Sequence, residues 1–311
     1  MKILTLSVLT VAAMPTTAQP QSADAPDLSL YGSLRVHANV VSVDDAVGDK
    51  SDTEFGLTDA YSRVGATLDF DLGETEISFK TELGLNVADL KLGDPSFFDD
   101  EDVRVYRVKA SGDWGSLLVG KDWLPYYNNV GYPVDYFSSI YAGYTTYAYF
   151  RERMVAYTTP TFDGFSGTVA RIERTGGGAS GWHGTLSHTG DKLTMAVGME
   201  NMDGATADTY GASVSYMDGP WYLAAKIEGQ DGRDAIYNGF IQHRSGKWTS
   251  KLGVGFGDQY SGTTLHAGVD YQLNDDWKLF AETYAEQENY ALLFDGAKGS
   301  SDYLGAGGFG A

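Results

Sequence analysis

The most regular feature of the sequence is a two-residue alternation of apolar and polar side chains that recurs along most of the chain. At residues 28–40 every even position is leucine, glycine, valine or alanine, and every odd position carries a hydroxyl, amide, imidazole or guanidinium group. Successive side chains of a strand point to opposite faces, so this segment predicts a strand with one apolar and one polar face. A strand that crosses a bilayer in a barrel needs about 9–11 such residues, although a strand of a soluble sandwich can share the pattern.

Fifteen further segments continue the alternation and predict strands. They are residues 60–72, 76–87, 103–111, 116–122, 151–159, 165–174, 181–188, 192–200, 208–216, 221–228, 235–243, 248–256, 265–273, 277–286 and 302–311. Which face points outward stays open for 103–111, 165–174 and 235–243. In 103–111 either choice turns an arginine outward, Arg104 or Arg107, and arginine near the bilayer midplane costs about 2–4 kcal/mol. We therefore expect this strand to contact another protein subunit.

The connections between these segments alternate in length and point to one architecture. Short turns at 72–74, 112–115, 189–191, 217–220, 244–247 and 274–276 alternate with longer polar loops at 41–56, 88–102, 201–207, 229–234 and 287–301. Aromatic residues near the short turns suit a band at a membrane interface: Phe70, Trp114, Trp221, Trp248, Tyr271 and Trp277. A sheet in lipid must close on itself to pair its backbone groups. The sequence thus predicts an all-β fold, a transmembrane antiparallel β-barrel of 16 strands around a water-filled channel.

The segment from residue 123 to 150 interrupts the alternation and is the longest connection between predicted strands. It contains eight tyrosines and one acidic residue, Asp135, and Arg151 and Arg153 follow it directly. A loop of this length is usually functional or disordered, and its aromatic content argues against a disordered linker. We expect this loop to fold into the lumen and pack against the barrel wall.

The ends and the composition of the chain indicate an exported protein. Residues 1–18 combine Lys2, a short apolar stretch and small residues, which predicts a signal peptide whose cleavage site lies between residues 18 and 25. Residues 19–311 then form the barrel, and the absence of cysteine is consistent with export without disulfides. A formal charge of −20 argues against nucleic acid as a partner.

Four sequence segments, in this order and around this loop, resemble the Gram-negative general porins. They are LSLYGSLRV at 28–36, SRVGATLDFDLGE at 62–74, GDWGSLLVGKDWLPYY at 112–127 and RERMVAYTTPTFDGFSG at 151–167. The resemblance implies a trimeric barrel in the outer membrane, in contact with lipid and lipopolysaccharide. Its function would be passive diffusion of small hydrophilic solutes and ions, without a cofactor. The end of the chain departs from the family, because Phe309 is third from last where the family closes on an aromatic residue, so we expect a short final strand.

The resemblance also implies a set of pore residues. The third long loop of this family narrows the barrel, and its acidic residues face basic residues on the wall. By position, Asp135 matches the loop acid, and Arg63, Arg104 and Arg151 match the wall arginines. Alternation alone adds three basic residues and the loop supplies four aromatic ones: Lys80, Arg35, Arg153, Tyr126, Tyr127, Tyr136 and Tyr141. The many tyrosines leave open a porin that prefers sugars or other neutral solutes.

Other functions find less support in the sequence. The acidic run Asp99, Asp100, Glu101 and Asp102 has the oxygen ligands that calcium prefers, although a solvated loop is the simpler interpretation. The five histidines are scattered over four predicted strands, and no serine lies beside one in a recognisable catalytic motif, so we expect no enzyme. A secreted soluble β-sandwich that binds a ligand remains the alternative fold.

Overall fold

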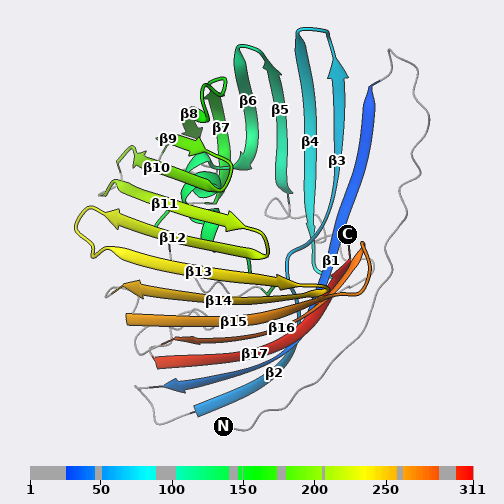
Figure 1. Ribbon diagram of the computed structural model, residues 1–311, viewed down its shortest axis with the longest axis vertical. Helices are drawn as coiled ribbons and strands as arrows, with labels where there is room; N and C mark the ends of the chain where they lie inside the picture. Colours follow the sequence, from blue (N-terminus) through cyan, green and yellow to red (C-terminus); the bar gives the residue numbers. More distant parts are fainter. Residues whose placement is uncertain are drawn as a thin grey trace.

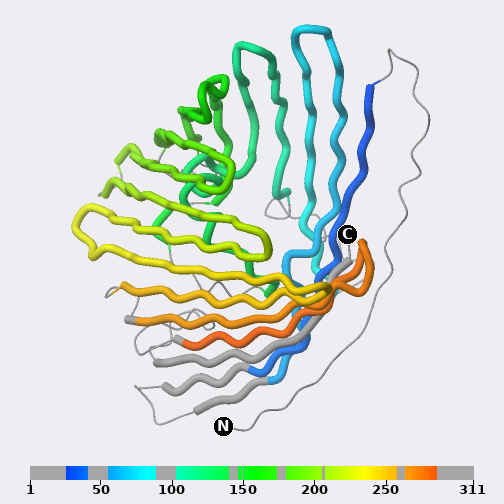
Figure 2. Tube along the Cα trace, viewed as in Figure 1, coloured from blue at the N-terminus to red at the C-terminus, as the bar shows by residue number. Residues whose placement is uncertain are grey.

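The computed structural model describes residues 26–45, 51–88, 103–139, 146–148, 150–173, 180–204, 207–257, 262–286 and 299–310. In this part of the chain 17 strands form one sheet in which every pairing is antiparallel. The strands are β1 (Asp27–Asp45), β2 (Ser51–Asp59), β3 (Ser62–Asp71), β4 (Thr75–Leu85), β5 (Val103–Gly112), β6 (Gly115–Trp123), β7 (Arg151–Thr158), β8 (Phe165–Glu173), β9 (Gly181–Thr189), β10 (Leu193–Met202), β11 (Thr209–Asp218), β12 (Trp221–Gln230), β13 (Ile236–Ser245), β14 (Trp248–Gly257), β15 (Gly262–Gln272), β16 (Trp277–Glu286) and β17 (Gly299–Gly310). Figure 1 labels these strands, and Figure 2 follows the chain through its successive hairpins.

The strand pairing runs around a complete ring. From β3 to β17 each strand pairs with the next, β17 pairs with residues 34–45 of β1, and β1 pairs on its other edge with β2 and β3. The cycle of pairings from β1 through β3 to β17 and back to β1 is unbroken, so the ring closes on itself as a sheet in lipid must. A two-layered soluble sandwich, the alternative fold, is wrong.

Strands β2 and β3 are two halves of one crossing, which reconciles 17 labelled strands with the predicted 16. Both halves pair with β1, and the register shifts by one residue between Val36↔Asp59 and Ser33↔Arg63. The backbone N–H of Ala60 still donates to the Arg35 carbonyl at 2.9 Å. The extra residue is a β-bulge, and it leaves Tyr61 with a φ of 64°.

The two faces of the barrel differ as the alternation predicts. The outer face exposes apolar side chains along each hairpin, among them Leu28, Leu30, Leu117, Val119, Val155, Val169, Leu186, Val197, Leu223, Ile227, Leu252 and Leu265. The inner face carries buried polar and charged side chains, among them Glu82, Arg104, His183, Glu200, Lys226, Glu228, Lys251, His266 and Glu282. Trp114, Trp221 and Trp248 are exposed beside the short turns, where the sequence predicted an aromatic band.

The strand whose facing was ambiguous from the sequence, β5, turns both of its arginines inward. Its register against β4 shifts at Glu82, and this bulge places Arg104 on the inner face, where its Nε lies 2.7 Å from a Glu82 oxygen. Arg107 also points inward, with its Nε 3.1 Å from Asp122. The prediction of an outward arginine at a subunit contact is therefore wrong. An alternation count cannot register a residue inserted by a bulge.

Two other strands were ambiguous because their inner faces are partly apolar. On β8 the buried side chain of Ile172 packs with Leu124 and Met154, and on β13 Phe240 packs with Tyr127. These inward apolar residues cover the loop that fills part of the lumen. The rule that apolar side chains of a barrel strand point outward therefore fails where the inner face of the wall contacts protein instead of water.

The loop inside the ring contains two short helical turns, η2 (Tyr127–Gly131) and η3 (Tyr132–Val134). These turns contact β10, β11, β12 and β13, and in Figure 1 they are the green coiled segment within the curve of the sheet. The described part of the chain contains no helix that is both long and apolar enough to cross a membrane. Folding of the loop into the lumen is confirmed for its described residues.

An arginine placed at the middle of the outer face should destabilise the barrel. Leu252, on the outer face of β14, is 42% exposed, so Leu252→Arg should lower the free energy of unfolding by about 2–4 kcal/mol. Thr249→Arg on the inner face of the same strand, opposite Asp270, should change it by less than about 1 kcal/mol. Urea unfolding in lipid bilayers measures both, and equal costs for the two variants would contradict the assignment of the faces.

Candidate functional site

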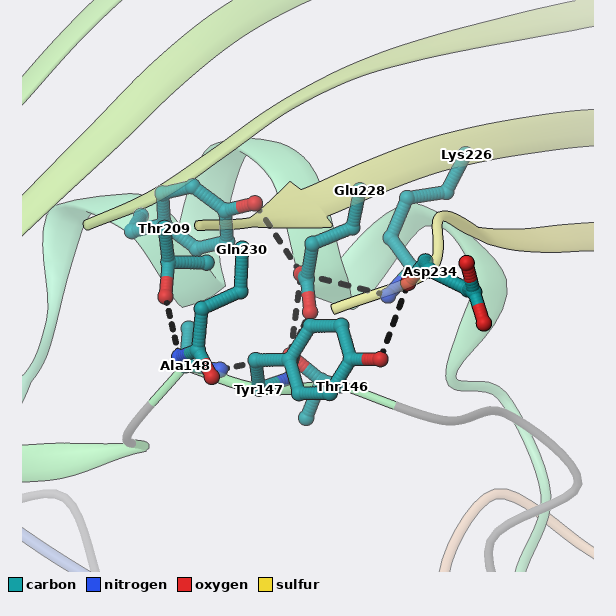
Figure 3. Close-up of polar contacts among 9 residues, drawn as sticks. Thr146, Tyr147, Ala148, Thr209, Lys226, Glu228, Gln230 and Asp234 are labelled. Carbon is teal, nitrogen blue, oxygen red and sulfur yellow. Dashed lines mark hydrogen bonds and ion pairs between the residues drawn. The ribbon is translucent and has the colours of Figure 1, made fainter. Parts of the chain in front are cut away.

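The loop is fixed to the wall at Glu228 of β12 (Figure 3). The Glu228 carboxylate accepts hydrogen bonds from the Tyr126 hydroxyl at 3.0 Å, from Thr146 Oγ1 at 3.0 Å and from the Tyr147 backbone N–H. The ammonium group of Lys226 lies 3.3 Å from the same carboxylate, and both side chains are fully buried. Hydrogen bonds to a charged acceptor are roughly twice as strong as neutral ones, so this carboxylate holds both ends of the loop.

A second carboxylate, Glu282 of β16, holds the middle of the loop. It accepts the backbone N–H groups of Ser138 at 2.7 Å and of Ser139 at 3.0 Å. The ring of Phe137 stacks on His266 with a centroid distance of 3.5 Å, and His266 Nε2 lies 3.3 Å from Glu282. Backbone donors that would otherwise be buried without partners are thus satisfied by the wall.

Aromatic contacts continue this attachment across the lumen. Ring centroids are 4.7 Å apart between Trp123 and Tyr127, 6.1 Å between Tyr127 and Tyr132, and 5.0 Å between Tyr132 and Tyr136. Tyr136 then lies 5.1 Å from Tyr222 on the wall. The series of rings spans from the start of the loop to β12, so the loop body packs against the side of the barrel formed by β10–β13.

The arginines predicted to line the pore lie on the other side of the barrel. Arg35, Arg63 and Arg104 come from β1, β3 and β5, and Arg35 lies within electrostatic range of the other two. Glu82 is the carboxylate among them, with Arg104 Nε at 2.7 Å and Arg63 Nε at 3.9 Å. The cluster has one shared counterion for several guanidinium groups.

Arg151 joins this cluster where the chain returns from the loop to the wall. It is paired in register with Trp123, and its guanidinium lies 4.8 Å from the Trp123 ring centroid. Arg104 lies 5.8 Å from the same ring, and Arg151 is within electrostatic range of Arg104 and Glu82. Cation–π contacts of this kind hold a guanidinium against an aromatic face without neutralising it.

Asp135 is the loop acid, and it lies within electrostatic range of Lys226 and Glu282 on the wall that holds the loop. Its carboxylate accepts a hydrogen bond from the Tyr127 hydroxyl at 2.7 Å, and Tyr61 lies in the electrostatic field of Asp135, Arg104 and Arg151 together. Burial raises the pKa of Asp135 to about 6, against the lowering effect of the Tyr127 hydrogen bond. Tyr61 is thus in range of both the loop acid and two of the wall arginines.

The comparison with protein families decides what kind of barrel this is. The family model described as Gram-negative porin matches residues 6–291 of the sequence. The chain belongs to the Gram-negative porins. It is an outer-membrane β-barrel that acts as a channel for passive diffusion, as the sequence resemblance implied.

Solved structures show the same fold. The anion-selective porin from Comamonas acidovorans is 19% identical with a TM-score of 0.72, and the match covers 92% of this chain and 99% of that one. Salmonella typhi OmpF in complex with daunomycin is 14% identical with a TM-score of 0.69, over 93% and 99% of the two chains. The trimer form of Vibrio cholerae OmpT is 15% identical with a TM-score of 0.61, over 92% and 99%. No curated protein sequence matches this porin.

The structure brings most of the predicted site residues together, but not all. Lys80 points inward, 5.3 Å from the Tyr31 ring, one inward position from Glu82 on β4. Arg153 does not join the cluster, because it lies on the face of β7 that exposes Val155 and Tyr157. The prediction from alternation that Arg153 lines the pore is therefore corrected. Arg151 has the same parity, but it turns inward because the chain leaves the wall at that residue. Tyr141, the signal segment 1–18 and the acidic residues Asp99, Asp100, Glu101 and Asp102 lie outside the described residues.

The residues that position this site could not be identified from the sequence. Glu82 stood on a predicted polar face, yet nothing in the sequence marked it as the counterion of Arg63 and Arg104. Glu228 lies 102 positions from Tyr126, and Glu282 lies 144 positions from Ser138, so no local pattern links either acid to the loop. The polar faces of their strands identified them only as inward residues.

Removing the Glu228 charge should loosen the loop. In Glu228→Gln the acceptor of the Tyr126, Thr146 and Tyr147 groups loses its charge, and each hydrogen bond to a charged group contributes about 1.5–3 kcal/mol. Single-channel recording should show a higher conductance and more current noise than in the native porin. Asp69→Asn on β3, opposite Ser78, is the matched control. A Glu228→Gln channel indistinguishable from native would show that this carboxylate does not hold the loop.

Proposed function

We propose that the channel narrows to a slot between Asp135 on the loop and Arg35, Arg63, Arg104 and Arg151 on the wall. The guanidinium groups outnumber the carboxylates Glu82 and Asp135 that face them. The charged groups of the opposite wall are paired among themselves, as in Lys226–Glu228 and in the contacts of Lys251 and Lys278 with Asp270 at 2.7 Å each. The positive excess therefore acts on the slot, and we infer a channel that passes small anions more readily than cations.

This proposal agrees with one of the solved relatives. The porin of Comamonas acidovorans is described as anion-selective, and it shares this fold at 19% identity. The formal charge of −20 works in the opposite sense at the channel mouths, where it draws cations. The field of the slot acts on an ion at short range and in a confined space, so it has the larger effect on selectivity.

We also propose how this channel assembles and what surrounds it. By analogy with the trimer form of OmpT, the porin assembles as a homotrimer, in contact with outer-membrane lipid and lipopolysaccharide. It catalyses no reaction and needs no cofactor, because diffusion requires only diameter and field. Residues 1–18 are removed as a signal peptide, and calcium binding at residues 99–102 stays a separate prediction.

A second candidate is a porin that prefers particular solutes. The observation in its favour is the exposure of aromatic rings beside the arginines: Tyr61 is 51% exposed and Tyr132 45%. Rings that were present only to pack the loop against the wall would be covered.

Neutralising a slot arginine should shift selectivity toward cations. Arg63→Gln or Arg151→Gln should lower the anion-to-cation permeability ratio by at least roughly twofold, because a unit charge about 8 Å away in water changes an ion's energy by about 0.5 kcal/mol. Reversal potentials in a potassium chloride gradient measure this ratio.

The matched control is an arginine on the outer face. Arg171 of β8 pairs with Asp203 at 2.7 Å on the exposed surface, so Arg171→Gln should leave the reversal potential unchanged. If the slot variants behave like this control, the arginines do not set the selectivity.

The anion preference should increase as the solution becomes acidic. The pKa of Asp135 is raised to about 6 by burial, so its negative charge is present above that pH and lost below it. The permeability ratio of the native porin should rise between about pH 7 and 5. Asp135→Asn should have the higher ratio throughout this interval and show no such rise. An identical pH profile in both proteins would assign the titration to another group.

A further inference from the structure

Tyr61 is held in a backbone conformation that tyrosine rarely adopts. Its φ of 64° lies in the left-handed region, at the bulge between β2 and β3. Hydrogen bonds fix both sides of the bulge: Ser62 N–H donates to Asp59 at 2.8 Å, and Arg35 N–H donates to Ser62 Oγ at 2.8 Å. Glycine or asparagine would fit such a position more easily. Bulges re-aim side chains, and strain of this kind concentrates at functional sites.

The bulge places the Tyr61 ring beside the arginine cluster. Its centroid lies 5.8 Å from the Arg104 guanidinium, and Arg104 lies at the same distance from the Trp123 ring. Phe150 is 41% exposed and contacts Tyr127 at a centroid distance of 5.2 Å. Together with Tyr132, exposed rings come from the wall, from the loop and from the end of the loop. Apolar ring faces in contact with pore water can stack on a flat solute.

The guanidinium of Arg151 supplies a second, independent observation. The side chain is only partly buried, and among the residues that the structure describes no carboxylate lies within ion-pair distance of it. A partly exposed guanidinium without a carboxylate partner can pair with the carboxylate of a solute. The guanidinium group matches the geometry of a carboxylate and can bind it through two parallel hydrogen bonds.

We propose that this slot is a binding site for monocyclic aromatic carboxylates, with the ring against Tyr61 and the carboxylate at Arg151. The inference rests on the proposed anion-preferring slot and adds the solute class that it favours. A neutral sugar has a ring to stack but no charge for the guanidinium groups. A small inorganic anion has the charge but no ring. Only the aromatic acid uses both features at once.

The experiment compares two acids of the same charge and similar size. Benzoate and cyclohexanecarboxylate are titrated into the chloride current of the reconstituted native porin, and the half-blocking concentration of each is measured. Benzoate should block at a concentration about two- to twelvefold lower, since stacking on an aromatic ring contributes a free energy of about 0.5–1.5 kcal/mol. Equal half-blocking concentrations, or no block by either acid, would overturn the proposal.

Two variants of Tyr61 then locate the effect. Tyr61→Asn suits the positive φ and removes the ring, so the advantage of benzoate should fall by about fivefold. Tyr61→Phe keeps the ring and should retain it. If Tyr61→Asn behaves like native, the ring of Tyr61 is not part of the site and the proposal fails. If the native porin shows no preference for chloride, the proposed function itself fails, so the two failures are distinguishable.

Discussion

The structure depends first on the requirement that a backbone in lipid satisfies its own hydrogen bonds. Because water is absent from the hydrocarbon, a sheet is stable there only as a closed ring. The pairing of β17 with β1 closes it, and residues 34–45 of β1 form this seam with residues 299–310. Closure sends one set of alternating side chains to lipid and the other to an enclosed interior. The polar interior is therefore a consequence of the ring and does not have to be built by a second layer.

A ring of this size leaves a wide lumen, and the loop is what makes it narrow. A loop folded into a lumen brings backbone N–H groups away from bulk water, and these groups need acceptors. Glu228 and Glu282 provide them on one wall, with Lys226 and His266 as nearby partners. The opposite wall keeps its arginines directed toward the open space. Attachment on one side and a field on the other explain why acids and bases are paired around the loop, whereas arginines outnumber acids on the opposite wall.

Most of the fold could be predicted from the sequence, because alternation is local and the membrane enforces it. The failures have physical causes at particular residues. A bulge at Glu82 moved Arg104 to the inner face, and another between β2 and β3 split one crossing into two labelled strands. Apolar side chains such as Phe240 point inward because they meet the loop instead of water. Arg153 was assigned to the pore because it shares its parity with Arg151. That parity points outward along β7, and Arg151 departs from it at the first residue of the strand.

The site could be predicted only in part. Basic residues on polar faces were identifiable, and Arg63, Arg104 and Arg151 do lie together in the structure. Their partners were not, since Glu228 and Glu282 reach the loop across more than a hundred positions of sequence. The conformation of Tyr61 was likewise invisible, because one inserted residue changes a backbone angle without leaving a compositional signal.

The most direct test of the account is the zero-current potential of the purified native porin across a planar bilayer with a tenfold gradient of potassium chloride. The structure predicts steady channels whose reversal potential has the sign of a chloride-preferring pore. A reversal potential with the sign of potassium preference would contradict the claim that the wall arginines control the narrowest part of the channel.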